Sequence, residues 1–100
     1  MKKILYFITD MDLMSIKFAL KEKKNQVGIC LLQDAVYFAC KGREDNKILE
    51  EAIKQDTQVF TVKKDVELRG LINRIYTDVK ILDYPEIIDL VLSYDRIINI

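Results

Sequence analysis

The sequence predicts an α/β fold: a single-domain, three-layer α/β/α arrangement with a mainly parallel five-stranded sheet. Short apolar runs of strand type alternate with segments of helical periodicity along the chain. The runs are almost continuously apolar, which is typical of strands covered by helices on both faces. Helices between such strands form right-handed crossovers and make the sheet parallel. We expect residues 1–100 to form one domain, because this length suffices for a single hydrophobic core.

Five apolar runs are the expected strands. They comprise Lys3 to Thr9, Val27 to Leu32, Gln58 to Val62, Val79 to Leu82 and Arg96 to Ile100. We expect the short last run at an edge of the sheet. The second run contains Cys30, which we expect to be buried as a small apolar residue.

The first two helices are expected to begin at aspartates. Asp10 or Asp12 can cap a helix that runs to about Lys23, because a carboxylate accepts the free N–H groups of a first turn. The expected buried stripe of this helix comprises Leu13, Ile16 and Leu20. Asp34 can in the same way cap a short apolar helix from Ala35 to Cys40.

Three further helical segments follow. Asp45 begins a helix whose expected buried face comprises Ile48, Leu49, Ala52 and Ile53. Asp65 to Leu71 is a short helical turn, with Gly70 near its C-terminal end. Pro85 suits the first turn of the last helix. The expected buried face of that helix comprises Ile87, Ile88, Val91 and Leu92.

The composition argues against several classes of function. Sixteen basic residues balance sixteen acidic ones, and the lysine clusters fall where helices or turns face water, so we expect no direct binding to nucleic acid. No apolar run approaches the roughly 18 residues of a membrane span, and the apolar stretch after the N-terminal lysines is too short for a signal peptide. We therefore expect a cytoplasmic protein. Without histidine and with only three glycines, we expect no metal site and no cofactor.

Asp10 and Asp12 resemble the paired aspartates of haloacid-dehalogenase-type phosphatases, whose motif is D-x-D-x-T. Met14 stands where that motif has threonine, and a core domain of that type usually needs a longer chain. Helix capping explains the two aspartates more simply.

Cys40 is the candidate for a reactive thiol. It ends the short apolar helix beside Lys41 and near Arg43, and nearby cations lower the pKa of a thiol. The negative end of the helix dipole acts in the opposite direction. Packing in the core is the alternative role of this side chain.

Three segments place polar residues where a strand meets the next turn or helix: Leu31 to Val36, Asp65 to Leu71 and Val79 to Tyr84. In a parallel sheet these junctions form one edge, where ligands and partners bind. The candidate residues of a partner-binding edge are Gln33, Asp34, Asp65, Arg69, Asp83 and Tyr84. The structural alternatives are that Asp34 and Asp65 cap helices, that Arg69 pairs with Asp65 one turn earlier, and that Gly70 supplies a left-handed backbone angle.

The order of these segments resembles the DsrH/TusB family of sulfur-relay proteins over nearly the whole chain. The family's Leu-Leu-Gln/Glu-Asp strand end is matched by Leu31 to Asp34, and its Asp-Val/Leu-x-x-Arg-Gly segment is matched by Asp65 to Gly70. The apolar helix with a following glycine corresponds to Tyr37 to Gly42, and the Asp-Tyr strand end to Asp83 and Tyr84.

This resemblance implies a part in a relay that passes sulfur between cysteine persulfides of small proteins. The partners that it implies are DsrE/TusD-like and DsrF/TusC-like subunits in a hetero-oligomer. The sulfur ends in 2-thiouridine at the tRNA wobble position in TusB-type systems, and DsrH-type systems serve sulfur oxidation. The family's acceptor cysteines correspond to Phe60 to Lys63 and to about Ala19, and neither place carries a thiol here.

The resemblance therefore implies a non-catalytic partner subunit. The high apolar fraction, Tyr37 with Phe38, and the terminal Ile97 to Ile100 suit a domain that buries surface against neighbours, although the same residues could fill its own core. Two alternatives stay open. One is a minor sulfurtransferase that uses Cys40, and the other is a stand-alone homo-oligomeric α/β protein of different function.

Overall fold

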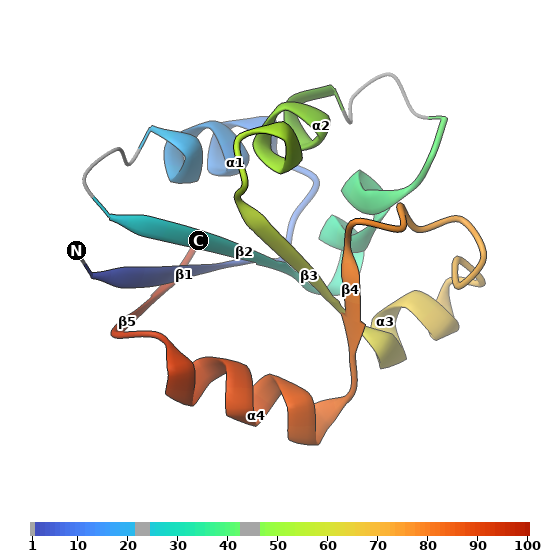
Figure 1. The fold of residues 1–100 in the computed structure, drawn as a ribbon. Coiled ribbons are helices and arrows are strands. Elements are labelled where there is room, and N and C mark those ends of the chain that lie inside the picture. Colours follow the sequence, from blue (N-terminus) through green and yellow to red (C-terminus); the bar gives the residue numbers. More distant parts are fainter. Residues whose placement is uncertain (1, 22–24, 43–46) are drawn as a thin grey trace.

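The computed structural model describes residues 2–21, 25–42 and 47–100, and its centre is one five-stranded sheet (Figure 1). The strands are β1 (Lys3–Ile8), β2 (Gln26–Leu31), β3 (Gln58–Val62), β4 (Lys80–Leu82) and β5 (Arg96–Asn99). They are arranged in the order β4-β3-β2-β1-β5, and every neighbouring pair is parallel. The α/β fold with a parallel five-stranded sheet is confirmed, and β5 lies at an edge as predicted.

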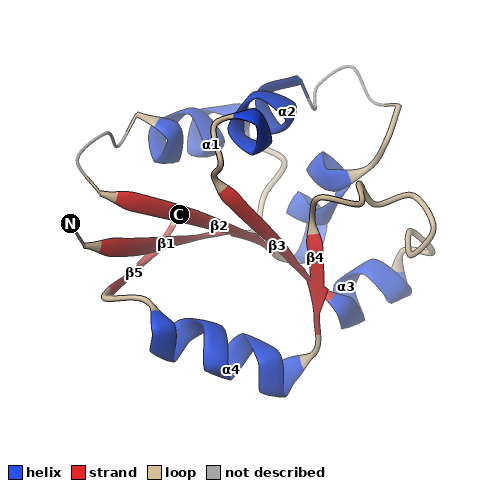
Figure 2. Cartoon of the chain, in the orientation of Figure 1, coloured by secondary structure: helices blue, strands red, loops and turns tan. Residues whose placement is uncertain are grey.

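The helices cover both faces of the sheet, which gives the three layers (Figure 2). They are α1 (Leu13–Leu20), the 3₁₀ helix η1 (Gln33–Ala39), α2 (Lys47–Lys54), α3 (Lys63–Leu68) and α4 (Tyr84–Ser93). The helices α1 and α2 lie over one face, and α4 lies over the other. The helices η1 and α3 follow directly after β2 and β3, at the carboxyl ends of the strands.

Two hydrophobic clusters occupy the two faces of the sheet. The larger one joins the sheet to α1, α2 and η1, and its fully buried side chains include Ile8, Ile16, Ile29, Phe38 and Leu49. The smaller one lies on the α4 face and comprises Leu5, Cys30, Phe60, Val62 and Tyr94. Burial of Cys30 in this second cluster confirms its predicted packing role.

The structure contains one predicted helix cap, Asp12, and a further cap, Asp83, at the start of the last helix. The Asp12 carboxylate accepts the backbone N–H of Met14 at 3.0 Å at the start of α1. At the start of α4, the Asp83 carboxylate accepts the N–H of Glu86 while the Glu86 carboxylate accepts the N–H of Asp83, both at 3.1 Å. Pro85 occupies the first turn of the same helix, as predicted. The expected end of the first helix near Lys23 and the expected cap Asp45 lie outside the described residues.

The capping roles considered for Asp34 and Asp65 are wrong. The helix η1 begins at Gln33, one residue before Asp34, and α3 begins at Lys63, two residues before Asp65. Each carboxylate therefore lies inside the first turn and makes contacts elsewhere. Gly70 does adopt the predicted left-handed conformation, with φ of +66° after the end of α3.

Several apolar residues differ in burial from the prediction. In α1, Leu13 is exposed although it was expected in the buried stripe. In α4, Ile87 and Val91 are half-buried as they face the sheet, whereas Ile88 is 57% and Leu92 is 78% exposed. Among the described helices, α4 is the one that lies over this face of the sheet (Figure 2), so the outer half of its broad apolar surface has no described helix to pack against.

The structure distinguishes between the two roles that the sequence left open for Tyr37 and Phe38. Phe38 is fully buried in the larger cluster and Tyr37 is half-buried, because η1 packs between the sheet and α3. Phe38 therefore belongs to the core and not to an exposed partner surface. Among the described residues, no helix is both long and apolar enough to cross a membrane.

Gly28 on β2 generates a first prediction, because Tyr94 occupies the space of a side chain there. A Cβ atom at Gly28 would overlap the phenol oxygen of Tyr94 and lie 2.8 Å from its Cζ atom. We expect Gly28→Ala to lower the free energy of unfolding by about 1–3 kcal/mol, measured by urea denaturation. The same substitution in a Tyr94→Leu background should cost clearly less, and an equal cost in both backgrounds would contradict this packing argument.

Candidate functional site

The polar residues at the carboxyl ends of β2 and β3 form one connected network. After β2 the chain turns at Gln33, whose φ of +50° is unusual for a residue with a side chain. The backbone N–H of Gln33 donates a hydrogen bond of 2.9 Å to Oδ2 of Asp65 in α3. Because backbone conformations of this kind persist only where the surroundings hold them, the Asp65 carboxylate fixes the path of the chain from β2 into η1.

Arg69 completes the network by joining η1 to α3. Its Nη2 and Nε atoms lie 2.9 and 3.3 Å from Oδ1 of Asp34. Its Nη1 atom donates to the backbone carbonyl of Asp65 at 3.1 Å and lies 3.8 Å from the carboxylate of the same residue. The predicted pairing of Arg69 with Asp65 is present, but the closer partner is Asp34, 35 residues away in sequence. The Asp34 side chain remains largely exposed, so the pair is at the surface and contributes only modestly to stability.

Beside this network lies a cavity of about 200 Å³ between the strand ends and the start of α4. Its lining residues are Leu32, Gln33, Val62, Lys64, Asp65, Tyr84 and Ile87. The wall is mostly apolar, and the charged groups in it are the Lys64 ammonium and the Asp65 carboxylate. Such a cavity fits one apolar side chain of a partner, with a donor and an acceptor at its margin.

The structure brings most of the predicted partner-edge residues together. Gln33, Asp65 and Tyr84 line the cavity, and Asp34 joins them through Arg69. Asp83 takes no part in the ion-pair network and acts as the cap of α4. By capping the helix, Asp83 sets the position of the exposed Tyr84 ring that follows it.

The sequence analysis missed four residues of the cavity. Leu32 lies in a predicted strand-end segment and Val62 in a predicted strand, but neither was among the candidate site residues, and Ile87 was expected only on the buried face of the last helix, while Lys64 was not singled out. One sequence feature could have identified Val62 and Lys64. They lie at the carboxyl end of the third predicted strand, just as Gln33 follows the carboxyl end of the second. These residues line one cavity because α4 crosses the sheet beside the strand ends, and no local sequence pattern predicts the path of that helix.

Both cysteines of the chain are buried. The Cys30 side chain is fully enclosed, and burial raises the pKa of its thiol to about 12, with a further increase from the negative charge of Asp65. Cys40 is 4% exposed, and its Sγ atom lies 3.9 Å from the carbonyl of Val36, at the limit of a weak S–H hydrogen bond. The position of Cys40 supports the packing role over the reactive one.

Most of the residues where the family resemblance implies an acceptor cysteine lie in the core. Of the stretch from Phe60 to Lys63, the first three residues are buried and Lys63 is exposed. Thr61 on β3 is fully buried, and its hydroxyl has no hydrogen-bond partner among the described residues. Ala19 on α1 is likewise fully buried. A persulfide at Thr61 or at Ala19 would need space that the packed structure does not provide, and the exposed Lys63 has no thiol.

The buried thiol of Cys30 gives a second prediction. Its pKa is raised in the folded state above the ordinary value of 9.0, so above pH 9 the unfolded chain loses this proton while the folded chain keeps it. Ionisation then stabilises the unfolded state, and stability falls as pH rises. Between pH 9 and 10 we expect the free energy of unfolding to fall by about 1 kcal/mol more in the wild type than in Cys30→Ala, measured by denaturant titration. Equal pH slopes in the two proteins would contradict the buried, protonated thiol.

Comparisons with known proteins agree with this fold. A family model described as "DsrH like protein" matches residues 9–97. Proteins named "Protein TusB" from Salmonella arizonae and Salmonella newport are each 35% identical over 66 residues, which is 66% of this chain and 66% of theirs. The match thus spans about two thirds of the length of these curated relatives.

Two solved structures share the fold over their full length. The ychN protein from E. coli aligns with a TM-score of 0.86 at 20% identity, covering 100% of both chains. A protein of unknown function from Methanobacterium thermoautotrophicum aligns with a TM-score of 0.80 at 11% identity, again covering 100% of both chains. Together with the match over residues 9–97, the sequence relatives show that this chain belongs to the DsrH-like family.

Proposed function

We propose that this chain is a non-catalytic subunit of a sulfur-relay complex that contains DsrE/TusD-like and DsrF/TusC-like subunits. The observation that carries the proposal is that a DsrH-like chain has both of its thiols buried while its strand-end network presents polar groups to solvent. The chemistry of the relay then belongs to a cysteine of another subunit. The subunit acts as one domain over residues 1–100 and works in the cytoplasm.

Persulfide transfer requires an accessible thiolate. The acceptor thiolate attacks the terminal sulfur of a donor persulfide; a new S–S bond forms, the old one breaks, and the donor leaves as a thiolate. Because burial raises the pKa of the Cys30 thiol to about 12, this thiol stays protonated at pH 7. Cys40 is buried at the end of η1, without access to a donor. These positions favour the accessory role over a sulfurtransferase that uses Cys40.

The strand-end site is the surface that meets a partner in this proposal. The Asp65 carboxylate and Arg69 hold the β2–η1 turn in place, and the exposed carboxylate of Asp34 and ring of Tyr84 are the groups that a partner can contact. The cavity between them accepts one apolar side chain of that partner. The relatives named TusB favour wobble-uridine 2-thiolation of tRNA over sulfur oxidation as the pathway, without direct contact of this subunit with RNA.

The substitution Arg69→Ala tests this proposal. It removes the contacts with Asp34 and with the Asp65 carbonyl, so we expect loss of most co-purifying partner subunits in native mass spectrometry of the tagged protein isolated from its host. The loss of folding stability should be about 1 kcal/mol or less, because the pair lies at the surface.

The control is Arg74→Ala, which removes an exposed arginine between α3 and β4 that takes no part in the strand-end network, and it should leave the complex intact. Unchanged partner recovery with Arg69→Ala would contradict the strand-end site as the interface. A wild-type protein that carries no other small subunits would contradict the proposed function itself.

A further inference from the structure

The Lys64 ammonium is a charge at the strand ends that the fold itself does not use. It lies on the exposed side of α3, at the margin of the cavity of about 200 Å³ whose wall includes Leu32, Val62 and Ile87. We call this space the strand-end cavity. Among the residues that the structure describes, Lys64 has no partner in a hydrogen bond or an ion pair. A free cation beside an apolar wall can bind an anion from outside the chain.

The other charged groups at this place are engaged with one another. The Asp65 carboxylate accepts the N–H of Gln33 at 2.9 Å and lies 3.8 Å from Nη1 of Arg69. The same guanidinium pairs with Asp34 at 2.9 Å. The remaining ionisable group in the wall is the phenol of Tyr84 on α4, and the other lining residues are uncharged. Lys64 is thus the cation of the site that is left to balance an external charge.

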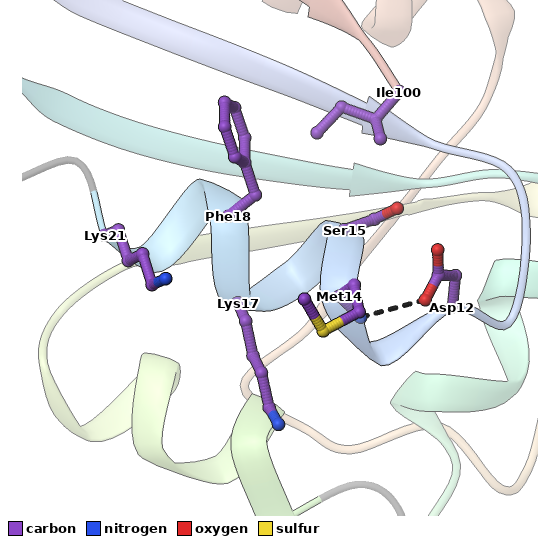
Figure 3. A pocket seen from close by; sticks show the side chains of 7 residues that line it. All are labelled: Asp12, Met14, Ser15, Lys17, Phe18, Lys21 and Ile100. Carbon is purple, nitrogen blue, oxygen red and sulfur yellow. Dashed lines mark hydrogen bonds between the residues drawn. The ribbon is translucent and has the colours of Figure 1, made fainter.

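A larger hollow beside α1 combines lysines with apolar side chains in a different way (Figure 3). Its volume is about 330 Å³, and its lining includes Met14, Phe18, Ile100, Lys17 and Lys21. In Figure 3 the Lys17 side chain extends to a different side of α1 from Phe18, so charge and apolar surface are separated there. The strand-end cavity is smaller and holds its lysine beside the proposed interface residues, which makes it the better match for a small charged group.

The sulfur anion of a cysteine side chain has both properties that the strand-end cavity selects. The side chain is short, and its polarisable sulfur packs well against apolar groups, while the thiolate carries one negative charge. An apolar wall by itself raises the pKa of a thiol, whereas a nearby cation lowers it and favours the reactive thiolate. A cavity of this kind therefore needs its lysine in order to hold a cysteine in the reactive form.

We propose that the strand-end cavity receives the reactive cysteine of a partner subunit and that the Lys64 ammonium balances the charge of its thiolate. This inference rests on the proposed function and adds to it a part for this chain in the chemistry of its partner. The thiolate attacks the terminal sulfur of a donor persulfide; one S–S bond forms as the other breaks, and the donor leaves as a thiolate. Lys64 gains and loses no proton and forms no bond, so the sulfur never resides on this chain.

The test follows the pH dependence of cysteine alkylation in the intact complex, isolated from its host through a tag on this chain. Iodoacetamide is added at a series of pH values, and the alkylated cysteine peptides are quantified over time by mass spectrometry. Lys64→Met removes the charge and keeps an apolar stem, and Lys64→Arg keeps the charge. The matched control is Lys63→Met, which removes the exposed neighbouring lysine that does not line the cavity.

We expect Lys64→Met to slow alkylation of the most reactive partner cysteine about tenfold at pH 7, because loss of a nearby opposite charge raises a pKa by about one unit. The whole pH profile of that cysteine should move to higher pH. Lys64→Arg and Lys63→Met should follow the wild type, and all three variants should retain the partner subunits.

An unchanged pH profile in Lys64→Met, with the partner subunits still bound, would overturn the role of Lys64 and leave the proposed function standing. An equal shift in Lys63→Met would also overturn it, because the effect would then come from surface charge in general. Loss of the partner subunits in Lys64→Met would make the lysine a docking contact and overturn it as well. A wild-type protein without partner subunits would contradict the proposed function, and this inference with it.

Discussion

The contact between the Asp65 carboxylate and the backbone N–H of Gln33 is the constraint on which the strand-end site depends. An all-parallel sheet brings the carboxyl ends of its strands to one edge, but it does not determine how the chain leaves each strand. The Asp65 contact holds Gln33 in its left-handed conformation, and Arg69 then joins the start of η1 to α3. The cavity beside Tyr84 takes its shape from this arrangement.

The same packing supports the accessory role that we propose for this chain. The thiol of Cys30 lies between the sheet and α4, close enough to Asp65 for that charge to raise its pKa further. The thiol of Cys40 closes the end of η1 in the core. The residues that could react are therefore enclosed, whereas those that could recognise a partner lie at the surface.

Much of the fold could be predicted from local patterns, because strand propensity, caps and apolar periodicity act over short distances. The strands agree with the prediction within about a residue at each end, and the Asp12 cap and the Gly70 turn are present. Long-range contacts could not be predicted in the same way. Periodicity identified an apolar face on α4 but not that Ile88 and Leu92 lack a cover, and no spacing rule pairs Asp34 with an arginine 35 residues later.

The most direct test of the central claim is to follow a labelled sulfur atom through the isolated complex. The complex would be loaded with isotopically labelled persulfide sulfur, blocked with an alkylating reagent, and its cysteine peptides identified by mass spectrometry. The account predicts the label on a cysteine of a partner subunit and none on Cys30 or Cys40. Labelled persulfide on Cys40 would show that this chain carries sulfur itself and would contradict the accessory role.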